Sequence, residues 1–279
     1  MKNFKGVFTA LITPFKNGKV DFDSLERLVQ HQVKNRITGF VVNGTTAESP
    51  TLKDQEVIEI FKFIRSKVGP NFPLIMGTGN NDTETTIKKS KEAEALGADA
   101  VLVVVPYYNK PPQRGLLEHY VKVADAVNIP VILYNVPSRT ITALELPTIK
   151  KLSEHPNIIG IKEASGNIAF LREIKEQCGD EFLVLSGDDA TYDEFMMNGG
   201  HGTISVASHL FPQVFHERKA SKYLPLINYL FVEANPIPVK MAMHLMGVID
   251  SPELRLPLVT LTDNHKAKLK ELLKEAELI

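Results

Sequence analysis

The chain has 279 residues, of which 43% are hydrophobic, and its 32 basic and 33 acidic residues leave a formal net charge of −1. This length and apolar content suffice for one large core, and the lack of a basic surplus argues against a nucleic-acid partner. The first residues lack the apolar segment of a signal peptide, the longest apolar run is too short to cross a bilayer, and Cys178 is a single cysteine, so we expect a cytoplasmic protein with no membrane partner.

Short apolar, β-branched runs alternate along the chain with segments of helical period. The runs are residues 7–12, 40–42, 73–76, 100–105, 131–134, 158–161, 182–185 and 203–206. They are apolar throughout, which predicts parallel strands buried on both faces. Eight such units predict an α/β fold, the (β/α)8 TIM barrel. A doubly wound open sheet is the alternative, but the first run ends in Thr13-Pro14 and not in a Gly-rich phosphate turn.

After residue 206 the pattern changes to helical segments only, over residues 225–233, 238–247 and 262–278. We therefore expect a catalytic barrel over residues 1–222 and a small C-terminal helical extension over residues 223–279. In such barrels the active site lies at the C-terminal ends of the strands, so those positions are the candidates for chemistry.

One lysine, Lys162, follows the apolar run 158–161. A charged lysine at the inner end of a buried strand is costly unless it is paired or used, and burial favours a neutral, nucleophilic amine. The residues alone leave two interpretations open. Lys162 is either a nucleophile that forms a Schiff base, or one half of an ion pair with Glu163, Asp188 or Asp189.

Other strand ends carry further candidates, each with a plainer alternative. Tyr134 and Tyr108 have hydroxyl groups suited to proton transfer, although buried tyrosines often only fill core space. The backbone N–H groups and hydroxyls of residues 44–49, GTTAES, suit a carboxylate, although such turns often only cap helices. Arg139 suits a second carboxylate, although loop arginines are usually solvated. No histidine pairing or nucleotide-binding motif is present, so we expect no metal and no cofactor.

The motifs at these strand ends resemble those of the dihydrodipicolinate synthase (4-hydroxy-tetrahydrodipicolinate synthase) family, within the larger group that includes N-acetylneuraminate lyase. They are GTTAESPTL (44–52), GTGNND (77–82), PYYNKP (106–111), LYNVPSRT (133–140), IIGIKEASGN (158–167), LSGDDA (185–190), GGHGTISV (199–206), NPIPVK (235–240) and LRLPL (254–258). Because they occur in order over almost the full length, the resemblance favours the Schiff-base interpretation of Lys162.

The resemblance implies a role for each catalytic candidate. Lys162 forms an imine with pyruvate, and Tyr134 is the general acid and base beside it. Thr45 links Tyr134 to Tyr108 in a proton relay. In the family the tyrosine matching Tyr108 comes from a neighbouring subunit, so the resemblance implies a homodimer or homotetramer.

It also implies the substrates and the residues that bind them. Thr46 and Thr45 hold the pyruvate carboxylate, Arg139 binds the carboxylate of L-aspartate-4-semialdehyde, and the backbones of Gly187 and Ile204 line the pocket. The reaction is the condensation that gives 4-hydroxy-tetrahydrodipicolinate in diaminopimelate and lysine biosynthesis. The alternatives are a lyase for N-acetylneuraminate or a 2-keto-3-deoxy sugar acid, and a non-catalytic barrel that senses a keto acid.

Three features depart from the family pattern. Ala47 replaces a common glycine, which requires that the backbone there avoid positive φ. Asp54, Val57 and Thr85 stand where feedback-inhibited members bind lysine with histidines and a glutamate, so we expect little or no inhibition by lysine. Residues 207–230 form a stretch about a dozen residues shorter than the family pattern, so either the eighth barrel helix or the first appended helix must be truncated.

Overall fold

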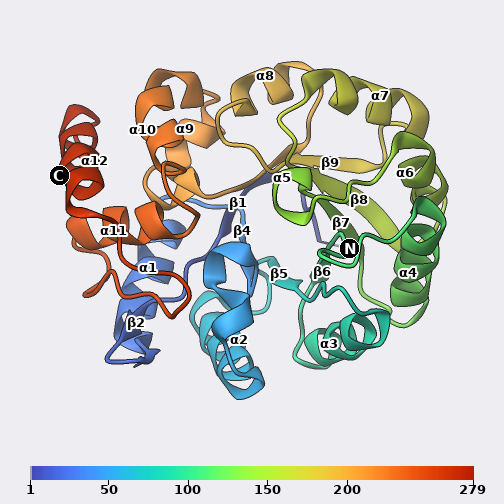
Figure 1. The fold of residues 1–279 in the computed structure, drawn as a ribbon, viewed down its shortest axis with the longest axis horizontal. Coiled ribbons are helices and arrows are strands. Elements are labelled where there is room, and N and C mark those ends of the chain that lie inside the picture. Colours follow the sequence, from blue (N-terminus) through green and yellow to red (C-terminus); the bar gives the residue numbers. More distant parts are fainter. Residues whose placement is uncertain (1) are drawn as a thin grey trace. The chain divides into compact units, whose positions relative to one another are not determined.

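The computed structural model describes residues 2–279, and eight parallel strands close into a barrel in the order β1-β10-β9-β8-β7-β6-β5-β4 (Figure 1). The strands are β1 (Gly6–Ala10), β4 (Gly39–Val42), β5 (Leu74–Gly77), β6 (Ala100–Val104), β7 (Val131–Asn135), β8 (Ile158–Glu163), β9 (Leu183–Ser186) and β10 (Gly202–Ser205). Every predicted run forms a strand, with ends within about two residues of the prediction. The predicted TIM barrel is therefore confirmed.

By their internal contacts the residues form two compact units. Unit 1 comprises Pro73–Ile204 together with the N-terminal stretch up to Gly6, and unit 2 comprises Val7–Phe72 together with Ser205–Ile279. The predicted division into a barrel over residues 1–222 and an extension over residues 223–279 stays a prediction.

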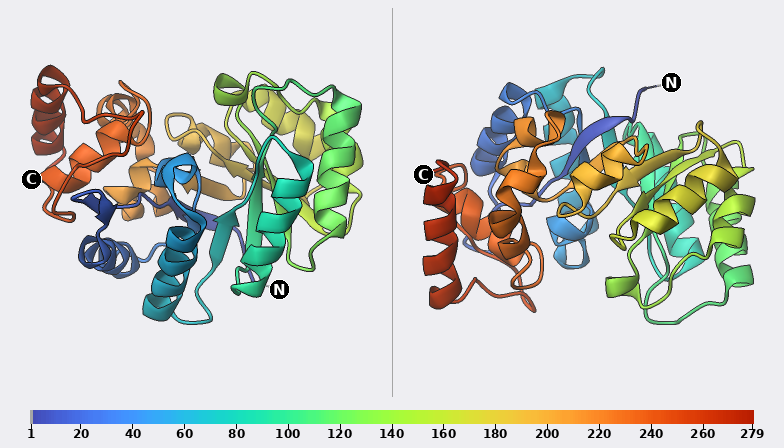
Figure 2. Two further views of the ribbon diagram at one scale, coloured as in Figure 1. Left: turned by 60° about the horizontal axis from the view of Figure 1, so that its bottom comes forward. Right: turned by 90° about the horizontal axis from the view of Figure 1, so that it is seen from above.

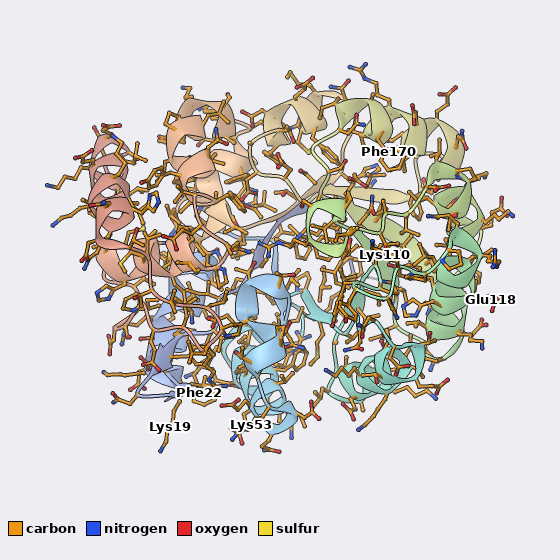
Figure 3. All side chains as sticks on the ribbon, viewed as in Figure 1. Lys19, Phe22, Lys53, Lys110, Glu118 and Phe170 are labelled. Atoms are coloured by element: carbon orange, nitrogen blue, oxygen red, sulfur yellow. The ribbon has the colours of Figure 1, made fainter. Side chains whose placement is uncertain are left out.

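Unit 1 alternates strands and helices. Its helices are α3 (Thr83–Ala95), α4 (Gln113–Asp125), α5 (Pro137–Thr140), α6 (Leu146–Ser153), α7 (Ile168–Cys178) and α8 (Tyr192–Met197). Figure 1 shows α3, α4, α6 and α7 along the outer side of strands β5 to β9. In Figure 3 the labelled Glu118 extends from the outer side of α4, whereas Leu116 and Tyr120 of the same helix are fully buried. The helices thus cover the strands with one apolar face, as helical periodicity predicts.

Unit 2 combines elements from the first quarter of the chain with those that follow β10. Its further elements are β2 (Phe15–Lys16), β3 (Lys19–Val20), α1 (Phe22–Lys34), η1 (Thr45–Ala47), η2 (Ser49–Thr51), α2 (Asp54–Val68), η3 (Ala207–His209), α9 (Pro212–His216), η4 (Ala220–Tyr223), α10 (Leu224–Tyr229), α11 (Ile237–Leu245) and α12 (Asp263–Glu275). Helix α12 packs against α10 and α11, and both views in Figure 2 show it beside α11 at the red end of the chain. The expected C-terminal helices are therefore present.

Aspartate side chains cap the first turns of two helices. Asp21 accepts a hydrogen bond from the Ser24 N–H at the start of α1, and Asp82 accepts one from the Thr85 N–H at the start of α3. Such side chains satisfy backbone donors that the first helical turn leaves free.

Residues 207–230, the stretch predicted to be shortened, contain only short helices. The helix after β10, α9, has five residues, and α10 has six. Among residues 2–279, no helix is long and apolar enough to span a membrane.

Candidate active site

Lys162 lies in β8 with its side chain in the interior of unit 1. In the strand register it stands between Tyr134 of β7 and Leu185 of β9, and only 6% of it is exposed. Its Nζ lies 4.4 Å from the centre of the Tyr134 ring, which is itself 8% exposed. The parallel register thus places a buried amine against the face of a buried tyrosine, an arrangement that attracts a cation and also places a hydroxyl group nearby.

Two of the three carboxylates predicted as possible ion-pair partners of Lys162, Glu163 and Asp188, bind other groups. Glu163 accepts hydrogen bonds from the Asn135 Nδ2 (2.7 Å) and the Ser165 N–H (2.6 Å). Asp188 accepts bonds of 2.9 Å from both the N–H and the hydroxyl of Thr191. Within residues 2–279 Lys162 forms no ion pair. The geometry therefore favours the nucleophile over the structural ion pair, because an amine held by a carboxylate is not free to attack a carbonyl.

Gly187 leaves the space that the lysine side chain occupies. A Cβ at position 187 would lie 2.7 Å from Cε of Lys162 and 2.6 Å from Cβ of Ala164. Both distances are far below van der Waals contact, so any side chain here would displace Lys162. The Gly187 N–H donates to the Glu163 carbonyl (2.7 Å), which holds the backbone at this position. Ile204, on β10, is 1% exposed.

Two other predicted residues of unit 1 are exposed and lie in the segments that follow their strands. Tyr108, after β6, is 89% exposed and has φ 77°. This left-handed conformation is uncommon for a residue with a side chain, and such strain often marks a functional position. Arg139 lies in α5 and is exposed. The structure thus brings Lys162, Tyr134 and Gly187 together, and it places Tyr108 and Arg139 at the surface of unit 1.

The loop that carries Arg139 is anchored by a residue that the sequence did not single out. Asn135, the last residue of β7, donates from Nδ2 to Glu163 and accepts at Oδ1 from the Leu144 N–H (3.0 Å). It therefore ties the far end of the loop, residues 136–143, to β8. Burial raises the pKa of Glu163, which is 2% exposed. The only signal in the sequence was a polar residue at a strand end, which does not reveal its partners.

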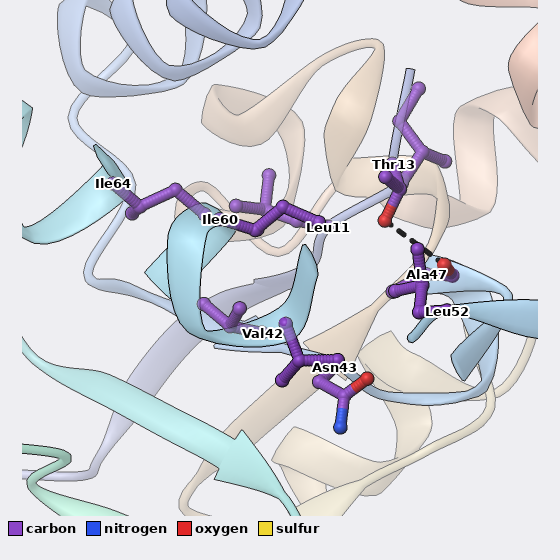
Figure 4. Close-up of a pocket in the computed structure, with 10 residues that line it drawn as sticks. Leu11, Thr13, Val42, Asn43, Ala47, Leu52, Ile60 and Ile64 are labelled. Carbon is purple, nitrogen blue, oxygen red and sulfur yellow. Dashed lines mark hydrogen bonds between the residues drawn. The ribbon is translucent and has the colours of Figure 1, made fainter. Parts of the chain in front are cut away.

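The predicted carboxylate-binding threonines of unit 2 form a short 3-10 helix, η1, after β4. Thr46 is buried and Thr45 is half-buried. The Thr13 hydroxyl donates to the Ala47 carbonyl (2.9 Å), as the dashed line in Figure 4 shows. As expected, Ala47 has no positive φ, and the left-handed residue is instead Glu48 (φ 58°). The turn is therefore compatible with alanine in place of glycine.

A small pocket beneath this turn is apolar. Side chains from the segment after β1, from β4 and from α2 line it, among them Leu11, Val42 and Ile60 (Figure 4). It belongs to the packing of α2 on β4 and on the segment after β1, and it offers no converging polar groups for a substrate. Within residues 2–279 no group of three His, Cys, Asp or Glu side chains is arranged to hold a metal.

The chain matches known proteins over nearly its whole length. Residues 3–276 match the model of the dihydrodipicolinate synthetase family. A 4-hydroxy-tetrahydrodipicolinate synthase from Bdellovibrio bacteriovorus is 56% identical, with 99% of each chain covered. The alignment runs over 289 positions, so at least ten positions in it have no residue among the 279 of this chain.

Solved structures agree with this match. The dihydrodipicolinate synthase from Thermotoga maritima has a TM-score of 0.95 and 40% identity, and 99% of each chain is covered. The chloride-inhibited dihydrodipicolinate synthase from Acinetobacter baumannii, solved in complex with pyruvate, has a TM-score of 0.95 and 40% identity, covering 99% of this chain and 100% of that one. The predicted resemblance is thereby confirmed: the chain belongs to the dihydrodipicolinate synthetase family.

Proposed function

We propose that this chain condenses pyruvate with L-aspartate-4-semialdehyde through a Schiff base on Lys162, giving 4-hydroxy-tetrahydrodipicolinate. The observation that carries the mechanism is the buried Lys162 amine, which has no carboxylate partner and lies against Tyr134. Family membership supports the reaction and the class of enzyme, a lyase, and the related Acinetobacter enzyme was solved with pyruvate.

In the proposed reaction the Lys162 amine attacks C2 of pyruvate, and the carbinolamine loses water to give the imine. Loss of a proton from C3 gives the enamine, whose C3 attacks the aldehyde carbon and whose electron pair forms the new C–C bond. The aldehyde oxygen takes up a proton. The amine of the second substrate then adds to C2 and releases Lys162 as it closes the ring. Protons therefore move at the carbinolamine, at C3, at the aldehyde oxygen and between the two amines during ring closure, and the Tyr134 hydroxyl is the group we assign to these transfers.

The binding groups are assigned by the same motifs. Thr45 and Thr46 hold the carboxylate of pyruvate, and the backbones of Gly187 and Ile204 line its site. Arg139 binds the carboxylate of the aldehyde substrate, and its exposed position in α5 suits an entrance. A guanidinium fork is well matched to a carboxylate.

Tyr108 is assigned to the site of a neighbouring subunit, where Thr45 would link it to Tyr134. Its exposure of 89% and its left-handed backbone support this role, because a side chain held out from its own unit gains contacts only from another surface. The active form would then be a homodimer or homotetramer. We also propose a cytoplasmic location, and a catalytic barrel over residues 1–222 followed by the extension.

Free lysine is proposed not to regulate this chain. Val57 lines the apolar pocket under the threonine turn (residues 44–48), and the N–H of Thr85 donates to the carboxylate of Asp82, which caps α3. Asp54 is exposed. None of these three residues is a histidine or a glutamate, the residue types that would hold a lysine molecule. A submillimolar inhibition constant for lysine in the condensation assay would contradict this proposal.

The decisive test of function is reductive trapping. Incubation with pyruvate and borohydride, followed by peptide mass mapping, should place a pyruvyl adduct on Lys162 and inactivate the enzyme. Replacing Lys175, whose amine is paired with Asp180, by arginine should leave trapping unchanged, whereas Lys162→Arg should abolish it. An adduct on another lysine would refute the mechanism, and faster cleavage of N-acetylneuraminate or a keto-deoxy sugar acid would refute the substrate assignment.

A further inference from the structure

We propose that Asn235 is a positioning residue for pyruvate, and that the C-terminal segment containing it holds the threonine turn in its binding conformation. The inference rests on the proposed function, because it assigns a role to the hydroxyl of Thr46 toward the substrate carboxylate. It concerns two motifs, NPIPVK (235–240) and LRLPL (254–258), that no catalytic step uses.

The central contact joins Asn235 to Thr46. The Asn235 Nδ2 donates to the Thr46 hydroxyl oxygen at 2.9 Å, and the two residues are 6% and 3% exposed. A hydroxyl that accepts a bond from an amide N–H keeps its own proton free to donate to another acceptor. A carboxylate is such an acceptor, so the amide fixes the polarity that Thr46 needs to bind pyruvate.

The other end of the same amide has a feature rare in purely structural asparagines. Its Oδ1 is buried and has no hydrogen-bond partner within residues 2–279. Buried polar atoms are nearly always satisfied, and the exceptions concentrate at functional positions. If the amide were flipped, Oδ1 would accept the Thr46 proton and remove it from the substrate. In the orientation seen here, an aspartate at position 235 would take the Thr46 proton away from the substrate. In the flipped orientation, an aspartate would leave the bond to Thr46 as it was.

A buried ion pair holds the residue that ends the turn. Glu48, two residues after Thr46, takes the left-handed conformation, and its carboxylate accepts from the Lys240 Nζ at 2.5 Å and from the Arg255 N–H at 2.9 Å. The side chains of Glu48 and Lys240 are both fully buried. The Lys240 Nζ also donates to the Glu253 carbonyl at 2.8 Å. Burial lowers the pKa of Lys240 to about 8, while Glu48 opposes this shift.

Arg255 binds the chain just beyond the threonine turn. Its guanidinium forms a two-pronged contact with Glu56 at 2.6 and 2.7 Å and also donates to the Thr51 carbonyl at 2.9 Å. Phe15 lies within 4.1 Å of the Lys240 Nζ and 4.3 Å of the Arg255 Cζ, measured to its ring centre. The C-terminal segment therefore holds the threonine turn at several points between residues 46 and 56, through Asn235, Lys240 and Arg255.

Steady-state kinetics of Asn235→Ala and Asn235→Asp test the proposal. With Asn235→Ala, the KM for pyruvate should rise about tenfold or more, since an oriented hydrogen bond to a charged group is lost, while the KM for the aldehyde and kcat change little. Asn235→Asp should raise the pyruvate KM further, because the new carboxylate takes the Thr46 proton and repels the substrate. Aspartate is nearly isosteric with asparagine, so this variant carries the test if the alanine variant fails to fold.

A double-mutant cycle separates positioning from general loss of structure. If Asn235 acts through Thr46, then Asn235→Ala should add little to the pyruvate KM of Thr46→Val. Tyr229→Phe is the matched control. It removes another hydrogen bond of unit 2, between the Tyr229 hydroxyl and the His265 Nδ1 (2.8 Å), and should leave the pyruvate KM unchanged.

The possible outcomes are distinguishable. Folded Asn235 variants with an unchanged pyruvate KM, or effects that simply add in the cycle, would overturn the positioning role while leaving pyruvate trapping by the wild-type protein intact. Failure of the wild-type protein to trap pyruvate at all would instead overturn the proposed function.

Discussion

His209 should make the free energy of unfolding depend on pH below neutrality. It lies fully buried in η3, where its Nε2 accepts the Ile12 N–H at 3.1 Å and its Nδ1 donates to the Val206 carbonyl at 2.7 Å. Only a neutral ring with its proton on Nδ1 can make both bonds. Burial, the largest cause, lowers the pKa of His209 to about 4, and the bond to Val206 only partly offsets it.

The size of the effect follows from that pKa. An unfolded histidine has a pKa of 6.5, so between pH 6.5 and 4 the unfolded chain binds more protons at this site than the folded chain. The free energy of unfolding should therefore decrease as the pH falls through this window. The slope from one such group is about 1.4 kcal/mol per pH unit, and the total is on the order of 3 kcal/mol.

Substitution of His209 by glutamine isolates this contribution. Glutamine does not titrate, so at pH 7.5 the variant should be less stable by about 1–3 kcal/mol through loss of the fitted ring. That difference should shrink steadily as the pH falls to 4.5, in denaturant unfolding at a fixed protein concentration. His119, whose pKa burial also lowers to about 4, remains in both proteins and cancels. A difference that stays constant with pH would refute this account, as would an NMR titration of the His209 ring near pH 6.5.

Two further predictions concern the loops of unit 1. Glu163→Gln replaces one carboxylate oxygen by an NH2 group, so either the Asn135 Nδ2 or the Ser165 N–H loses its acceptor. The segment with Arg139, which Asn135 anchors, should then become more mobile. The KM for the aldehyde substrate should then rise about five- to twentyfold, with pyruvate trapping unchanged; a rise in the pyruvate KM alone would contradict this. For Tyr108, mixing subunits of the inactive variants Tyr108→Phe and Lys162→Ala should restore about a quarter of wild-type activity, since half of randomly formed dimers regain one complete site. No recovery after exchange would show that Tyr108 acts within its own subunit.

The barrel could be predicted because its signals are local. Each buried parallel strand is a continuous apolar run, and Lys162 stands out as a charge at the end of one of them. The hairpin β2–β3 was missed because its strands have only two residues each. Its turn, Asn17-Gly18, has positive φ at both residues and is a typical hairpin turn, so the signal was present.

The support of the site was not predictable in the same way. The contact of Asn235 with Thr46 spans 189 positions, and that of Lys240 with Glu48 spans 192. No spacing rule joins residues so far apart, and an isolated asparagine or lysine on a helical segment is usually solvated. The motifs containing these residues could be linked to a family, but their physical role needed the three-dimensional structure.

The position of these contacts explains why a shortening of residues 207–230, as the sequence predicts, would not harm the site. The short helices α9 and α10 lie between Ile204 and Asn235 along the chain, so the predicted shortening would fall between two parts of the proposed site and within neither. Changing the length of a connection costs little free energy, whereas leaving a buried charge such as Glu48 without its partner is expensive. The Glu48–Lys240 pair and the Asn235–Thr46 bond are both formed despite the short helices. Any consequence of the shortening should therefore appear in surfaces formed by α9 and α10, and not in the affinity for pyruvate.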